Sequence, residues 1–140
     1  MSKINMSFFN AYKELDSACA KRLGISRGGV SAYIGRLVEL KYVPERSDVL
    51  PRLIKYRKIR NILAHEENAF DRSFEITNSD VKWLSRLARR VERSSDPISR
   101  YERNTRFYSI WKRVRIAVFL LIALLLIISV IIILSNYGII

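Results

Sequence analysis

The side chains best suited to chemistry gather in one predicted helix in the middle of the chain. At about 100° per residue, Arg57, Asn61 and His65 recur at i, i+4 and i+8 on the face opposite the apolar residues, with Arg60 at the border. Two arginines, an amide and the only histidine of the chain therefore share one stripe, where any acid–base or anion-binding chemistry would be located. The alternative is a solvated helix face whose histidine lies near the helix end, where the helix dipole favours it.

The composition limits that chemistry. The chain has 140 residues, with one cysteine and one histidine. The single Cys19 excludes an intrachain disulfide framework and multi-cysteine zinc or iron–sulfur patterns, and the lone His65 excludes a histidine-cluster metal site. We therefore expect no metal and no cofactor, and a reducing compartment for the polar part of the chain.

Helical periodicity accounts for the polar part of the chain. Apolar residues recur at spacings of three and four in successive segments, and no stretch alternates convincingly with period two. A chain of this length allows one small domain, so we predict an all-α fold, a four-helix bundle. The predicted helices cover residues 7–23, residue 30 to before Pro44, residues 49–67, and the stretch from a capping cluster at 77–80 to a stop at 94–97.

Residues 116–134 form the most apolar run of the chain. Sixteen of these nineteen residues are Leu, Ile, Val or Phe, and no charge occurs between residues 116 and 140. A helix of this length at ~1.5 Å rise per residue extends ~28 Å, close to the ~30 Å hydrocarbon thickness of a bilayer. A domain of about a hundred residues cannot cover a helix that is apolar on every face. The sequence therefore predicts a transmembrane helix over residues 116–134.

A strongly basic segment precedes this run. The chain has 25 Lys and Arg against 13 Asp and Glu, and residues 82–115 alone carry eleven Lys and Arg against three Asp and Glu. By the positive-inside rule, this excess predicts a cytoplasmic N-terminal domain with a C-terminal anchor. Anionic lipid attracts such a juxtamembrane cluster, so much of the charge is explained without nucleic acid. We assign the headgroup contacts to Arg106, Lys112, Arg113 and Arg115.

These features divide the chain into four predicted parts. A cytoplasmic helical bundle covers residues 1–97, and a basic juxtamembrane segment covers residues 98–115. The single-pass transmembrane helix of residues 116–134 is followed by a short external tail, residues 135–140.

The run RNILAH, residues 60–65, resembles the signature of HEPN domains. In that signature an Arg followed by a polar residue is separated by four to six residues from a His, on a helix of a small all-α bundle. The start FFNAYKELDSAC, the segment GGVSAYIGRL and a Trp-containing helix that ends in Asp96-Pro97 are similar to small bacterial HEPN-like domains. The resemblance covers roughly residues 7–97 and does not include the apolar run.

The resemblance implies metal-independent cleavage of RNA by a homodimer, in stress, toxin or phage-defence roles. Attack of a ribose 2′-hydroxyl on the adjacent phosphodiester needs a base, an acid and cations for the phosphorane. In this interpretation His65 transfers protons, Arg60 clamps the phosphate, and Asn61 orients His65 or the substrate. Arg57 and Lys58 widen the basic, nucleic-acid-binding mouth. A two-fold dimer would bring two histidines into one cleft.

Two alternatives remain open. Some HEPN-like members have lost activity, and toxin-like members have a neutralising partner, so the first alternative is a catalytically silent interaction module with an unidentified protein regulator. The second is a membrane-anchored helix-turn-helix DNA-binding protein built on residues 20–34, with Arg27 and Ser31 at the start of the recognition helix. Against it, Gly28 and Gly29 would lie in the first turn of that helix and cost ~1 kcal/mol each relative to Ala.

Overall fold

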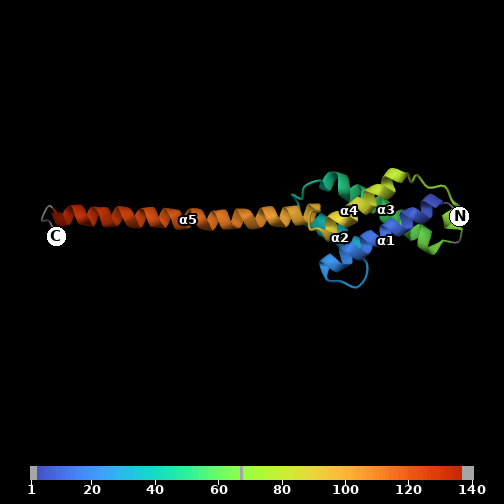
Figure 1. Ribbon diagram of the computed structural model, residues 1–140, viewed down its shortest axis with the longest axis horizontal. Helices are drawn as coiled ribbons and strands as arrows, with labels where there is room; N and C mark the ends of the chain where they lie inside the picture. Colours follow the sequence, from blue (N-terminus) through green and yellow to red (C-terminus); the bar gives the residue numbers. More distant parts are fainter. Residues whose placement is uncertain (1–2, 67, 137–140) are drawn as a thin grey trace. The chain divides into compact units, whose positions relative to one another are not determined.

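The computed structural model describes residues 3–66 and 68–136, and these residues form helices and no strand (Figure 1). The predicted all-α class is therefore confirmed. The predicted tail, residues 135–140, lies outside the described residues apart from the end of the last helix. The elements are α1 (Lys3–Leu23), α2 (Gly29–Glu39), α3 (Arg46–His65), the short 3₁₀ helix η1 (Ala69–Asp71), α4 (Asn78–Glu92) and α5 (Pro97–Asn136).

Two helices begin earlier than the periodicity predicts. Helix α1 begins at Lys3 rather than at residue 7, because the buried Asn5 donates through Nδ2 to the carbonyls of Phe70 and Arg72, at 3.0 and 2.9 Å. Helix α3 begins at Arg46 rather than at residue 49. Pro51 therefore lies inside α3 and not in its first turn, where the sequence pattern placed it.

The chain divides into two compact units, with the boundary between Glu102 and Arg103. The boundary falls inside α5, beyond the predicted domain end at residue 97. The reason is that the first turn of α5 belongs to the core of the first unit, where Ile98 is buried and Tyr101 packs against the cluster. Since α5 is one helix, the basic segment and the apolar run are continuous.

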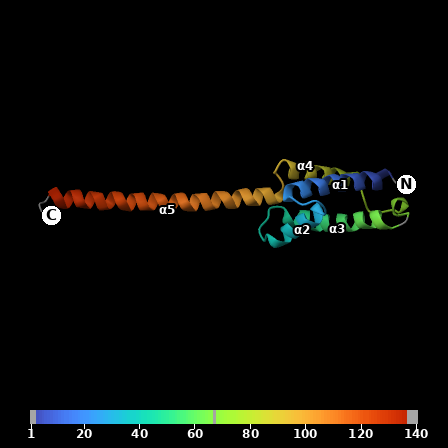
Figure 2. The same ribbon diagram turned by 90° about the horizontal axis from the view of Figure 1, so that it is seen from below.

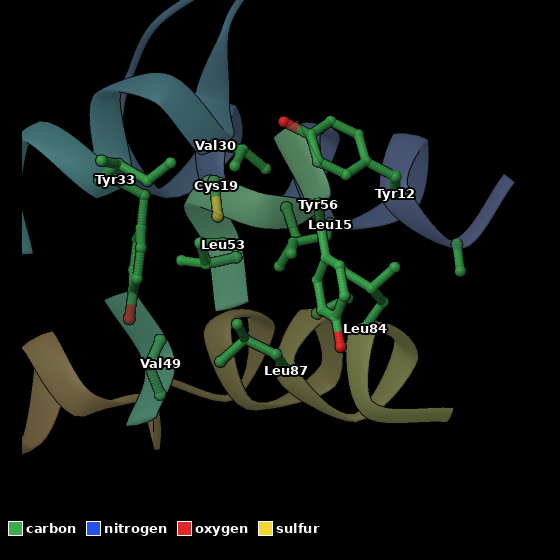
Figure 3. Packing of buried hydrophobic residues seen from close by; sticks show 14 of the residues in the cluster. Tyr12, Leu15, Cys19, Val30, Tyr33, Val49, Leu53, Tyr56, Leu84 and Leu87 are labelled. Carbon is green, nitrogen blue, oxygen red and sulfur yellow. The ribbon is translucent and has the colours of Figure 1, made fainter. Parts of the chain in front are cut away.

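Helix α1 is central to the first unit and contacts α2, α3 and α4. Helices α1 and α4 run in the same direction and α3 runs opposite to both (Figures 1 and 2). The core contains three tyrosines, and Figure 3 shows Tyr12 on the side of the cluster opposite Leu84 and Leu87. Its largest fully buried side chains are Tyr33, Phe8, Leu15, Leu37, Leu53 and Leu84.

The N-terminus of α4 is capped by the predicted cluster. Thr77 Oγ1 accepts a hydrogen bond from the Asp80 amide, and Asp80 Oδ2 accepts one from the Thr77 amide at 2.8 Å. The Tyr56 hydroxyl donates to Asp80 Oδ1 at 2.6 Å. Partial burial alone would raise the pKa of Asp80, but the hydrogen bonds from Tyr56 and Thr77 hold it below its ordinary value. The capping box thus also joins α4 to the middle of α3.

The consecutive glycines before α2 allow that helix to lie directly on α1. Gly28 is the N-cap of α2 at φ 68°, in the left-handed region that favours glycine. A Cβ on Gly29 would lie 2.0 Å from the carbonyl oxygen of Asp16 and 2.4 Å from the amide nitrogen of Ala20. The Asp16 side chain accepts a hydrogen bond from the Val30 amide at 2.8 Å. The close packing of α2 on the backbone of α1 therefore explains why residue 29 is a glycine.

Among the described residues, one helical region that ends at Leu134, in α5, is long and apolar enough to cross a membrane by length and composition. None of its most apolar window is buried in the chain. The basic residues before that window are exposed on α5: Arg106, Lys112, Arg113 and Arg115.

We expect Gly29→Ala to destabilise the first unit by about 1–3 kcal/mol or more, because the new methyl group meets backbone atoms that cannot rotate away. Gly35→Ala is the matched control in the same helix, where a Cβ has no atom within 4 Å. That substitution should stabilise the protein by about 0.5–1 kcal/mol through helix propensity. Thermal unfolding followed by circular dichroism checks both, and equal melting temperatures for the two variants would contradict the packing.

Candidate functional site

Helix α3 carries all five predicted motif residues on its outer side. Around the helix axis their order is Arg60, Arg57, Asn61, His65 and Lys58. Asn61, His65 and Lys58 are exposed, whereas the two arginines are half-buried. The buried side of α3 consists of Val49, Leu53, Tyr56, Ile59 and Leu63. One helix therefore presents two guanidinium groups, an amide, an ammonium group and an imidazole on one surface.

Arg60 is held against the first helix. Its Cζ lies 6.0 Å from the centroid of the Tyr12 ring, a cation–π distance. Its Nη1 donates to Oδ1 of Asn61 at 3.3 Å, whereas Nε is buried and has no hydrogen-bond partner within the described part of the chain. Burial and the charge of Asp16 raise the pKa of Tyr12 to about 12, although Arg60 and Arg57 act to lower it. Tyr12 is therefore neutral at physiological pH and serves as a platform for the guanidinium.

A hollow of about 440 Å³ opens beside Arg60. Its walls come from α1, from the turn between α1 and α2, and from α3. Asp16 contributes a carboxylate, which is engaged with the Val30 amide. The Tyr12 ring also lines the hollow. The remaining charged and hydroxyl-bearing side chains of the lining are Lys13, Ser17, Lys21, Ser26 and Arg60.

His65 is the last residue of α3, and its side chain is exposed. The chain after it is tied down, because Glu66 pairs with Arg72 and Asn5 holds the carbonyls of Phe70 and Arg72. The carboxylate next to His65 in sequence is therefore already engaged, and the imidazole stands at the edge of the motif surface.

A second group of polar side chains is buried where α1, α2 and α5 meet. The Asp96 carboxylate is 0% exposed and accepts hydrogen bonds from the Tyr33 hydroxyl at 2.8 Å and from the amides of Ile98 and Ser99 at 3.2 and 3.3 Å. The Ser99 hydroxyl also donates to it, and Arg22 Nε lies 3.8 Å from Oδ1. Since the Asp96 carboxylate itself is closed to solvent, we assign the cluster a structural role.

Cys19 lies beside this cluster and is equally inaccessible. Burial, followed by the charges of Asp16 and Asp96, raises the pKa of its thiol to about 12. A buried neutral thiol is a poor nucleophile. Within residues 3–66 and 68–136, no group of three or more His, Cys, Asp or Glu side chains could hold a metal ion.

The segment of the helix-turn-helix alternative is packed on α1. Helix α1 is one uninterrupted helix of 21 residues. Arg27 and Ser31 are exposed, but Gly29 and Val30 between them are buried. The first turn of α2 is thus occupied by packing, which leaves less of it available to a DNA groove.

Three residues beside the motif, Tyr12, Lys13 and Lys21, were not predicted from the sequence. Tyr12 belongs to the apolar stripe of α1, and the two lysines have the pattern of ordinary solvated residues. Their position next to Arg60 depends on how α1 crosses α3, and periodicity within either helix carries no information about that crossing.

The chain belongs to a family of unknown function, DUF6548, which matches residues 6–116. The matched region includes most of α1, all of α2 to α4 and the first part of α5. No curated protein and no solved structure matches the chain significantly.

Cys19 should resist iodoacetamide in the native protein at pH 8. A pKa of about 12 leaves roughly one thiol in ten thousand ionised at that pH, and the side chain is 1% exposed. Mass spectrometry should show alkylation at least ~100-fold slower than in 6 M guanidinium chloride. Equal rates in the two conditions would show that the thiol is accessible and that the packing described around it is wrong.

Proposed function

We propose that the chain is a membrane-anchored HEPN-like endoribonuclease that cleaves RNA as a homodimer and without a metal. In this proposal α1 to α4 are the four-helix bundle of a HEPN-like domain. Residues 116–134 cross the membrane with the N-terminal unit on the cytoplasmic side. Anionic lipid headgroups contact Arg106, Lys112, Arg113 and Arg115.

The observation that carries the proposal is the position of Arg60. Its Nε is buried without a partner among the described residues, as are those of Arg22 and Arg46, but the Arg60 side chain also lines the hollow between α1 and α3 and so can meet an anion there. Asn61 touches the same guanidinium, and His65 lies one turn further along the exposed side of α3. An anion held by Arg60 would therefore lie beside the surface of α3 that carries a side chain able to exchange protons.

These groups suit transesterification of RNA. The ribose 2′-oxygen forms a bond to phosphorus while one imidazole accepts its proton. The bond from phosphorus to the 5′-oxygen then breaks, and an imidazolium protonates the leaving oxygen, so the products are a 2′,3′-cyclic phosphate and a 5′-hydroxyl. Arg60 stabilises the charge of the phosphorane, Asn61 orients His65 or the substrate, and Arg57 and Lys58 attract the strand.

The need for both a base and an acid motivates the homodimer. Each chain has one histidine. A two-fold contact between motif surfaces would place two copies of His65 in one cleft, because an isologous interface presents the same patch twice.

The apolar helix supports a membrane location for this activity. Its apolar window is exposed throughout the structure, and an exposed run of that length is stable in hydrocarbon and not in water. The basic residues before it would be attracted to an anionic leaflet by ~1 kcal/mol each.

The full chain in uncharged detergent should cleave single-stranded RNA, and His65→Ala should lower the rate by about 10²- to 10⁴-fold, the usual contribution of general acid–base catalysis. EDTA should have no effect, and DNA of the same sequence should stay intact because it lacks the 2′-hydroxyl. Gel analysis of end-labelled oligonucleotides measures all three.

Arg27→Ala is the control, since this exposed residue is outside the motif and should leave cleavage unchanged. If RNA is cleaved equally by wild type and His65→Ala, the catalytic assignment is wrong and the silent interaction module replaces it. Loss of a specific duplex DNA complex in Arg27→Ala would favour the helix-turn-helix alternative.

Mixing His65→Ala chains with Arg60→Ala chains tests the homodimer. In a shared cleft the two defects lie in different copies of the motif, so a mixture should recover part of the activity that both pure variants lack. Activity that remains the weighted mean of the two pure variants would show independent sites in separate chains. Analytical ultracentrifugation of each mixture verifies that mixed dimers form.

A further inference from the structure

The hollow beside Arg60 is not used in the cleavage step described above. Its volume of about 440 Å³ lies within the range of about 300–1,000 Å³ that is usual for sites that bind small molecules. The space exceeds what a single ion needs and leaves room for a phosphate together with its sugar. A group larger than the scissile phosphate can therefore bind next to the motif.

Cations and hydroxyls line this space in a regular pattern. Lys13, Ser17 and Lys21 follow one another at i, i+4 and i+8 along one side of α1. Ser26 in the following turn and Arg60 on α3 complete the polar lining. In the part of the chain that the structure describes, neither lysine pairs with a carboxylate. Their charges are therefore available to an anion.

The carboxylate of this lining has another role. Asp16 Oδ1 accepts the hydrogen bond from the Val30 amide at 2.8 Å, which caps the first turn of α2. Its carboxylate is thus engaged with that helix, while Arg60 lines the hollow from α3. Three positive groups against one engaged carboxylate favour an anionic ligand. Two hydroxyls add donors for its oxygens.

We propose that this hollow binds a backbone phosphate of the RNA strand next to the phosphodiester that is cleaved, with Lys13 and Lys21 as its cations. Arg60 borders both the phosphate in the hollow and the phosphodiester that is cleaved. The identity of the ligand as RNA rests on the proposed function. Arg60 and His65 are separated by ~7.5 Å along the helix axis and by ~140° around it. A strand that occupies the hollow and the His65 position together would therefore cross the face of α3 that carries Arg57 and Asn61.

The test measures binding in a chain that cannot cleave. The full-length His65→Ala protein in uncharged detergent is titrated against a fluorescent single-stranded RNA, and fluorescence anisotropy gives Kd at several salt concentrations. Adding Lys13→Ala and Lys21→Ala should raise Kd at least ~10-fold and reduce the slope of log K against log salt by ~0.7 for each phosphate that the protein no longer neutralises. Lys13→Arg with Lys21→Arg should restore binding to within ~3-fold, because charge is what the site requires.

The matched control is Lys41→Ala with Lys82→Ala. This pair removes the same charge from positions outside the hollow, and Kd should change by less than ~2-fold. An equal rise in Kd for both pairs would show that total charge and not the hollow matters, and an unchanged Kd for both pairs would remove the subsite. Competition by uridine monophosphate as strong as that of the RNA would identify a free nucleotide as the ligand and overturn the assignment to a strand.

The outcomes separate this proposal from the function on which it rests. If the wild-type chain leaves RNA intact but the lysine pair still controls RNA binding, the nuclease is rejected and the subsite stands. If the wild type cleaves RNA and the lysine pair has no effect on Kd, the subsite is rejected and the nuclease stands.

Discussion

The carboxylate of Asp96 is fully buried, and a charge in that position must be satisfied by its neighbours or it destabilises the fold by several kcal/mol. Tyr33 supplies a hydroxyl from α2, Arg22 supplies a guanidinium from α1, and Ile98 and Ser99 supply the first amides of α5. The carboxylate is also the N-cap of α5. The same two amide hydrogen bonds therefore satisfy the carboxylate and cap the start of the helix. The cluster thus joins α1, α2 and α5, with Arg22 contributing its charge at 3.8 Å and not a hydrogen bond from Nε.

The motif helix is positioned by polar contacts at both of its ends. Before α3, Glu45 accepts hydrogen bonds from Arg90 at 2.8 and 3.0 Å and from Arg100 at 2.6 Å. The hydrogen bonds from Arg90 and the charges of both arginines hold the pKa of Glu45 below its ordinary value. After α3, Asn5 secures the chain around η1. Exposed ion pairs contribute about 0–1 kcal/mol each, so their main effect is to orient α3 and not to stabilise it.

The motif residues differ in how much the fold depends on them. Asn61 and His65 are exposed and can serve binding or catalysis with little effect on the core. Arg60 contributes to the core as well as to the candidate site. Its guanidinium covers the buried Tyr12 ring, while its Nε lacks a partner among the described residues. Nε of Arg22 and Arg46 also lack partners among the described residues, so what sets Arg60 apart is that its side chain lines the hollow and contacts Asn61. This is why Arg60, rather than the histidine, links the fold to the proposed chemistry.

Local sequence determined the helical class, the cap of α4, the apolar run and the faces of α3, because each depends on residues within a few turns of one another. It also placed Arg57, Lys58, Arg60, Asn61 and His65 on one side of a helix. Only the tertiary structure decided that α5 begins inside the core, that Gly29 packs on α1, and that Tyr12, Lys13 and Lys21 face Arg60. Those contacts join distant parts of the chain, and their geometry depends on helix crossings that no local pattern encodes.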